Sequence, residues 1–220
     1  MSTTTSGPDL PLLPVGKILC VGRNYADHAK EMGAPPPDEP LLFLKPPTAL
    51  RAEGGSIKLP TWSQDIHHEV ELVVRIDSEV IDGTIQECQT AVDACAVGLD
   101  LTARDIQTRA KKRGHPWCVA KGWDNSAPIS ALVPIQNIQE LEGRHLELEI
   151  DGERRQYGRL DQMIWSVPEL IAFASHRFRL EPGDLLFTGT PSGVGPIKKG
   201  DRIVSRLQGL AELEVVIESD

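Results

Sequence analysis

The most regular hydrophobic pattern along the chain lies in residues 69–76, which read EVELVVRI. From Val70 to Ile76 every second side chain is aliphatic, and this period of two predicts a β-strand with at least one buried face. Asp151 and Gly152 separate two further alternating runs and carry the signature of a tight hairpin turn. Together with these two runs, at 146–150 and 153–157, apolar or alternating segments predict strands at 17–22, 96–101, 184–189, 201–207 and 212–217.

Helical spacing is confined to four short segments. Residues 24–33 and 84–96 each carry apolar positions at helical intervals, and the first of these segments ends in a glycine. Thr102 and Asp105 resemble a capping box that opens a third helix. The sequence SVPE from Ser166 supplies an N-cap, an early proline and a capping acid for the fourth.

The order of these elements predicts the fold class and the domain organisation. Strands outnumber helices and do not alternate regularly with them, so an α+β fold around a mixed β-sheet core is expected. Residues 1–16 are rich in Ser, Thr and Pro without periodicity and predict a flexible N-terminal arm. No linker divides the remainder, which is expected to form a single domain over 17–220. Within it, the short helix and the stiff proline tether of residues 23–40 predict a lid.

The composition limits the kinds of partner and the cellular location that are expected. A formal net charge of −9 repels phosphate backbones, so no nucleic-acid partner is expected. No apolar run approaches the roughly 20 residues of a membrane span, so no membrane association is expected either. The four cysteines lack metal-ligand spacing and predict reduced thiols. With no signal or transit pattern at the N-terminus, a cytoplasmic protein is expected.

Glu69 and Glu71 raise the question of a metal site. Residues i and i+2 of a strand project to the same side, so the two carboxylates can converge on one hard cation. The same Glu-x-Glu pattern recurs at 147–149 and 212–214, where solvent-facing strand positions would explain it. The first pair differs because two histidines precede it and because Asp100 closes an apolar strand just before a predicted helix. A buried carboxylate needs a partner, which a cation can provide, but spacing alone leaves both interpretations open.

Six motifs in fixed order add a resemblance. GRNYADHAKE, FLKPP, HHEVEL, GLDLTARD, AKGWD and PGDLLFTGTPSGVG together resemble the fumarylacetoacetate hydrolase family, in particular its small single-domain acylpyruvase and oxaloacetate decarboxylase branch. The resemblance implies a mixed β-sheet roll or sandwich of the type of that family's C-terminal domain, with a few flanking helices, and a homodimer. Members that act on fumarylacetoacetate itself carry an additional N-terminal domain, so a smaller substrate is expected here.

The resemblance also implies a metal and a substrate. The acids that match Glu69, Glu71 and Asp100 bind Mg²⁺ or Mn²⁺ in that family, and its substrates share a 2-oxo acid end. The expected activity is hydrolysis of the C–C bond of small acylpyruvates (2,4-dioxo acids), with pyruvate enolate as a leaving group that the metal stabilises. Decarboxylation of oxaloacetate and keto–enol tautomerisation or isomerisation at the same site remain alternatives. A non-catalytic, metal-stabilised binding module is the alternative from a different class.

Several further positions match functional residues of the family. His28 and Glu31 lie at i and i+3 and share a helix face, and the resemblance makes them the base for water and its orienting carboxylate. Lys121 matches the catalytic lysine and is expected to stabilise the developing oxyanion. A passive binding module has no use for such a base. The positions that match substrate contacts are Arg104, Gln107 and Thr190.

Overall fold

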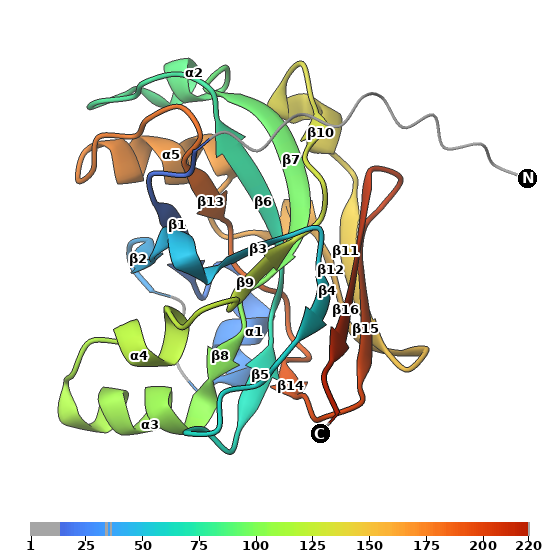
Figure 1. Ribbon diagram of the computed structural model, residues 1–220. Helices are drawn as coiled ribbons and strands as arrows, with labels where there is room; N and C mark the ends of the chain where they lie inside the picture. Colours follow the sequence, from blue (N-terminus) through green and yellow to red (C-terminus); the bar gives the residue numbers. More distant parts are fainter. Residues whose placement is uncertain (1–13, 34, 36, 220) are drawn as a thin grey trace, which may run out of the picture.

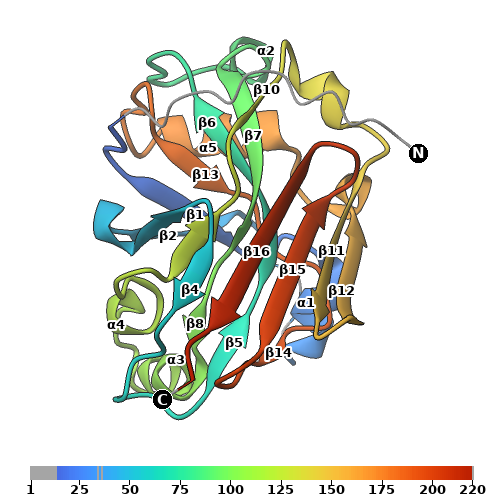
Figure 2. The same ribbon diagram turned by 45° about the vertical axis from the view of Figure 1, so that its right-hand side comes forward.

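The computed structural model of the chain describes residues 14–33, 35 and 37–219 (Figure 1). Most of the predicted arm at 1–16, as well as residues 34 and 36 of the predicted tether, therefore lie outside the described residues. Two large sheets and one small sheet form the body of the described chain, and the helices flank them (Figures 1 and 2). This architecture agrees with the α+β expectation.

The larger of the two main sheets holds the most buried strands. Its order is β2-β1-β13-β6-β7-β9-β3, and β10 also pairs with β7. β1 runs parallel to β13, whereas β6 and β7 form an antiparallel pair. Its strands are β1 (Ile18–Gly22), β2 (Leu41–Lys45), β3 (Leu50–Ala52), β6 (Val70–Ile76), β7 (Val92–Leu99), β9 (Ala127–Ile129), β10 (Val133–Pro134) and β13 (Leu185–Phe187).

A five-stranded sheet with the order β12-β11-β15-β16-β4 comes forward in Figure 2. Its strands are β4 (Gly55–Ile57), β11 (His145–Ile150), β12 (Glu153–Arg159), β15 (Arg202–Leu207) and β16 (Ala211–Ile217). Strands β11, β15 and β16 pack against β6 and β7 of the larger sheet. A third, three-stranded sheet has the order β14-β5-β8 and consists of β5 (Ile66–His68), β8 (Thr102–Ala103) and β14 (Gly195–Pro196).

The helices lie near the two ends of the larger sheet (Figure 1). Helices α2 and α5 pack against each other at one end, and α3 and α4 pack together near the other. The α-helices are α1 (Ala26–Glu31), α2 (Ile85–Cys88), α3 (Arg104–Arg113), α4 (Cys118–Lys121) and α5 (Val167–Ser175). Short 3₁₀ turns occur at η1 (Pro47–Ala49), η2 (Ile138–Leu141) and η3 (Leu160–Gln162).

The predicted alternating strand is confirmed as β6. Both of its faces are covered, because every residue of β6 is buried. Val70, Leu72 and Val74 join the main hydrophobic cluster between the two large sheets. Val73 packs on the opposite face in a second cluster that includes Phe187. The acidic positions that alternate with the aliphatic ones therefore project into the interior, not into solvent.

The hairpin and the fourth helix follow the sequence predictions. Asp151 and Gly152 have φ angles of 52° and 81°, as a two-residue turn with two left-handed positions requires. Ser166 and Glu169 form a reciprocal capping box at the start of α5. The local chemistry of the turn and of the cap decides both features, so the sequence alone was sufficient to predict them.

Two helix predictions are wrong in part. The helix expected over 84–96 ends at Cys88, and β7 begins at Val92. The small side chains of β7 fit between buried layers of the sheet, and this packing overrides local helical spacing. Thr102 is not a helix cap: it lies in β8, and its hydroxyl donates to the carbonyl of Asp100. Helix α3 begins at Arg104 instead.

Candidate active site and metal centre

Three carboxylates meet where β6 and β7 lie side by side. Glu71 belongs to β6, Glu69 directly precedes it, and Asp100 directly follows β7. The register pairs Val70 with Leu99, and the Asp100 N–H donates to the Glu69 carbonyl at 2.9 Å. One ligand oxygen from each acid lies within 4.8 Å of the others, and all three side chains are buried. The spacing of Glu69 and Glu71 and the placement of Asp100 thus produce the predicted convergence.

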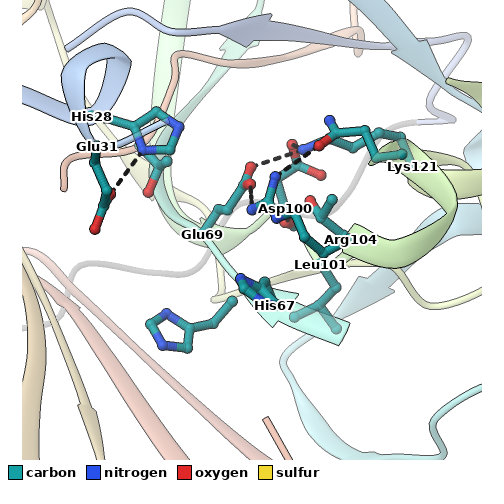
Figure 3. Close-up of polar contacts among 12 residues, drawn as sticks. His28, Glu31, His67, Glu69, Asp100, Leu101, Arg104 and Lys121 are labelled. Atoms are coloured by element: carbon teal, nitrogen blue, oxygen red, sulfur yellow. Dashed lines mark hydrogen bonds and ion pairs between the residues drawn. The ribbon is translucent and has the colours of Figure 1, made fainter. Parts of the chain in front are cut away.

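Three cationic side chains face these acids. Lys121 Nζ lies 2.8 Å from Glu69 Oε2 and 2.5 Å from Asp100 Oδ2. Arg104 pairs with Glu69 through Oε1, and Lys45 Nζ lies 2.9 Å from Asp100 Oδ1. Figure 3 shows Lys121 and Arg104 converging on this acidic group. The three positive and three negative charges balance formally within one buried cluster.

Within this cluster the pKa values of Glu69 and Glu71 shift in opposite directions. Burial raises the pKa of Glu69, but Lys121 and Arg104 outweigh burial and bring that pKa well below its usual range. Burial, reinforced by repulsion from Asp100 and Glu69, raises the pKa of Glu71 well above its usual range. Glu71 is therefore the acid that most needs an additional positive charge.

The donor set fits a hard divalent cation. Asp100 Oδ1 is buried and accepts no hydrogen bond, although Lys45 lies beside it, so a lone pair is free to bind a metal. Glu71 accepts one hydrogen bond, at 2.7 Å from the Gly189 N–H, and the repulsion from Asp100 and Glu69 outweighs the attraction of Lys121. Carboxylate oxygens without sulfur or imidazole are the ligands that Mg²⁺ and Mn²⁺ prefer. Glu69 would complete such a site, so the three predicted ligands are compatible with one cation.

The other two Glu-x-Glu pairs have no such environment. Glu147, Glu149 and Glu212 share Arg206 in an outward-facing network, and Glu214 pairs with Arg202. Partly exposed ion pairs of this kind are ordinary features of a solvated sheet face. The solvent-facing interpretation is thus confirmed for these two pairs and wrong for the first.

His28 is buried on α1 and faces the acidic cluster (Figure 3). Its Nδ1 lies 3.3 Å from Glu31 Oε2. Burial lowers the pKa of His28, and the opposing effects of Glu69 and Glu31 do not restore it. The imidazole is therefore neutral near pH 7, as a general base must be. Glu31 also accepts from the Gly193 N–H at 3.0 Å, which ties α1 to the loop that follows β13.

One pocket that opens to solvent brings the predicted site residues together. Arg104 and Gln107 project into it from α3, where the Arg104 guanidinium donates to Gln107 Oε1 at 2.8 Å. Thr190 lines it from the loop after β13, and His28 lines it from α1. Glu31 lies behind His28. The structure thus gathers every residue that the sequence predicted, although their individual roles stay predictions.

Sequence reasoning missed two residues. Lys45 lies in the quoted motif FLKPP but was given no role, yet it is 1% exposed and donates to Leu101, Lys121 and Ser126. These hydrogen bonds join the backbone segments that surround the acidic cluster. The quoted motif was the signal that could have identified it.

Gln156 is the second missed residue, and its amide is fully satisfied. It accepts from His68 Nδ1 and from the Val70 N–H, and it donates to Thr190 Oγ1 and the Pro191 carbonyl. One side chain from β12 thus links the strand that bears the carboxylates to the loop that bears Thr190. Nothing local in the polar run ERRQY distinguishes this glutamine from its exposed neighbours.

Replacing Gln156 by Ala should lower the free energy of unfolding by about 2–3 kcal/mol, because the variant leaves several buried polar groups without partners. Arg154→Ala changes an exposed residue of the same strand and should stay within about 0.5 kcal/mol of wild type. Urea denaturation of both variants is the measurement. Equal stability of the two would show that Gln156 does not link these elements.

The chain belongs to the fumarylacetoacetate hydrolase family: the family model for the fumarylacetoacetate (FAA) hydrolase C-terminal region matches residues 17–218. Mitochondrial oxaloacetate tautomerase FAHD1 of Arabidopsis thaliana is 44% identical over 202 residues, which cover 92% of this chain and 91% of the relative. The Bos taurus tautomerase of the same name is 42% identical and covers 91% of both chains.

The similarity to a solved structure supports the same family assignment. Fumarylpyruvate hydrolase of Pseudomonas aeruginosa, in complex with Mn²⁺ and pyruvate, has a TM-score of 0.87 and 40% identity, and the match covers 94% of this chain and 91% of that one. The family and the fold type inferred from the motifs are therefore confirmed. No helix among the described residues is long and apolar enough to cross a membrane, and the cytoplasmic location stays a prediction because the tautomerase relatives are mitochondrial by name.

Proposed function

We propose that the protein is a divalent-metal-dependent hydrolase that cleaves the C–C bond of small acylpyruvates. The observation that carries the proposal is a buried His28, oriented by Glu31, which shares one pocket with Lys121 and three convergent carboxylates. Mn²⁺ and pyruvate in the similar P. aeruginosa hydrolase support this choice of metal and product.

Glu69, Glu71 and Asp100 would hold the cation, Mg²⁺ or Mn²⁺. When bound, it would supply Lewis acidity toward the carboxylate and 2-oxo oxygen of the substrate. Because the six side chains balance when all three acids are ionised, a bound divalent cation gives the cluster an excess positive charge. That excess favours an anionic 2-oxo acid over a neutral ketone.

The positions of the side chains support the remaining steps. Arg104, Gln107 and Thr190 would hold the substrate carboxylate. His28 takes a proton from water as the water oxygen attacks the distal acyl carbonyl, and Lys121 donates a hydrogen bond to the developing oxyanion. The bond between C3 and C4 then breaks, C3 takes the proton from His28, and a carboxylic acid and pyruvate leave. Residues 23–40 would act as the lid. The hydrogen bond from the Gly193 N–H to Glu31 would hold this lid closed.

Tautomerisation of oxaloacetate is the second candidate, because two relatives above 40% identity bear that activity in their names. In this reaction His28 would carry a proton between C3 and the 2-oxo oxygen, and no water would be consumed. Acetylpyruvate and oxaloacetate assayed side by side, with and without EDTA, separate the two candidates. Metal binding without turnover of either substrate would instead indicate a binding module.

The pH profile should report His28. Because burial lowers its pKa below the ordinary value of 6.5, the base is already unprotonated at neutral pH. The ratio kcat/KM should therefore fall only as pH drops through that lowered pKa, with a midpoint below 6.5. Steady-state rates measured from acidic to neutral pH check this. A midpoint above that value would mean that another group is the base.

A further inference from the structure

The side-chain amide of Gln156 has only one possible orientation. Its Oε1 accepts from the Val70 N–H at 3.0 Å, and its Nε2 donates to the Pro191 carbonyl at 2.9 Å. A backbone N–H can only donate and a carbonyl can only accept, so the reversed amide would place donor against donor and acceptor against acceptor. His68 Nδ1 lies 2.8 Å from Oε1 and must therefore be the ring nitrogen that carries a proton.

This orientation decides the role of the Thr190 hydroxyl. Gln156 Nε2 lies 2.9 Å from Thr190 Oγ1 and can only donate, so the hydroxyl oxygen accepts this hydrogen bond. Within the described part of the chain, Thr190 Oγ1 makes no other hydrogen bond, so the hydrogen of the hydroxyl has no acceptor there. Thr190 lines the pocket that contains the three carboxylates. Its hydrogen is therefore available to a molecule bound in that pocket.

The loop that carries Thr190 is fixed on both sides. Pro191 packs so closely on β12 that a Cβ added at Gly158 would lie 2.4 Å from the Pro191 Cβ. On the other side, the Gly189 N–H donates to the proposed metal ligand Glu71 at 2.7 Å. The loop thus fixes where the Thr190 hydroxyl lies, and the neighbouring amide fixes which way its hydrogen points.

We propose that Gln156 is a positioning residue, which orients the Thr190 hydroxyl so that it donates a hydrogen bond into the pocket. This inference rests on the proposed function, in which Thr190 contacts the substrate carboxylate. A hydroxyl held as a donor favours a group that only accepts, and an ionised carboxylate is such a group. The Gln156 amide uses all four of its hydrogen-bonding positions inside the protein. Gln156 therefore acts through Thr190 and not by touching the substrate.

Gln156→Glu reverses this direction with little change in shape. One carboxylate oxygen can still accept from His68 and from the Val70 N–H, whereas the other replaces the amide donor and attracts the Thr190 hydrogen to itself. Calorimetry of the Mn²⁺-loaded protein measures the Kd of oxalate, an uncleaved mimic of the 2-oxo acid end. That Kd should rise at least about tenfold, the low end of the effect of a charged hydrogen bond. Mn²⁺ affinity should not fall, because the contact with Val70 is retained.

Thr190→Val separates the direction of the hydrogen bond from the added charge. The carboxylate introduced by Gln156→Glu also repels oxalate through space, and that repulsion does not require the hydroxyl. If the two residues are coupled as proposed, the loss of oxalate affinity caused by Gln156→Glu should be at least about fivefold smaller in the Thr190→Val background. An equal loss in both backgrounds, or a fall in Mn²⁺ affinity that accounts for it, would overturn the inference.

Gln156→Met provides a second test, because it removes the amide donor without adding a charge. It should raise the Kd of oxalate by about three- to tenfold, as the loss of an oriented neutral hydrogen bond does, and have little effect in the Thr190→Val background. Thr190→Ser keeps the hydroxyl and should bind oxalate nearly as wild type does. Full oxalate affinity in Thr190→Val would overturn the inference. Absence of acetylpyruvate turnover in wild type, with these Kd differences intact, would contradict the hydrolase but not the positioning role, because oxalate is not cleaved.

Discussion

A protein in which Glu71 is replaced by Gln should lose divalent-cation affinity by at least about 100-fold, and its turnover with it. Outer-shell changes around metals already cost 10–100-fold in affinity, and this change removes a proposed ligand. Glutamine keeps the shape of the side chain, and its amide oxygen can still accept from the Gly189 N–H. The expected loss therefore comes from the charge, not from packing.

Stability gives an independent check on Glu71. When the pKa of a carboxyl group is raised in the folded state, the folded protein loses stability as pH rises through that pKa. Glu71 is such a group. The metal-free Glu71→Gln protein should therefore be at least as stable as metal-free wild type at neutral pH, as measured by urea denaturation.

Glu149→Gln is the control for the metal experiment. Glu149 belongs to another Glu-x-Glu pair and faces Arg206 on the outer sheet, so its loss should change metal affinity and turnover little. Calorimetric titration of Mn²⁺ into the two variants makes the comparison. Equal Mn²⁺ affinity in Glu71→Gln and wild type would exclude this residue as a ligand.

Replacing His28 by Ala should lower kcat for acylpyruvate hydrolysis by about 10²- to 10⁴-fold, the usual contribution of a general base. Metal affinity should not change, because the three carboxylates lie on other elements. Oxaloacetate decarboxylation depends mainly on stabilisation of an enolate and should fall less. Steady-state kinetics on both substrates, with calorimetry for the metal, provide these values.

Lys30→Ala is the matched control for His28, since Lys30 lies on the same short helix and is exposed. It should retain activity within a factor of about two, as an ordinary surface substitution does. Undiminished hydrolysis by His28→Ala would remove the imidazole from the mechanism. Comparable losses in both variants would instead assign the effect to the structure of α1.

The convergence of the three carboxylates was predictable because local pattern and chain order agree. Glu-x-Glu on an alternating strand fixes which side chains share a face, but the pattern occurs three times in this chain. Only the two preceding histidines, Asp100 and the ordered motifs separated Glu69 and Glu71 from the outward-facing pairs. Sequence spacing alone does not show that β6 is covered on both faces.

The remaining features depend on long-range packing, which local patterns do not encode. Gln156 is buried because β12 brings it against Thr190, 34 residues later in the chain. Strand β7 replaced the end of a predicted helix because its small residues fill the centre of the larger sheet. Lys111 contacts the Trp117 ring where the end of α3 approaches the start of α4, and no periodicity of a single element indicates that approach.

The most direct test of the account is pyruvate release from acetylpyruvate by metal-free protein titrated with Mg²⁺ or Mn²⁺. Turnover should be absent after EDTA treatment, rise to saturation with either cation, and remain absent in Glu71→Gln at the same cation concentrations. Pyruvate release that persists undiminished in metal-free protein, or that is missing at saturating metal, would contradict a metal-dependent acylpyruvate hydrolase.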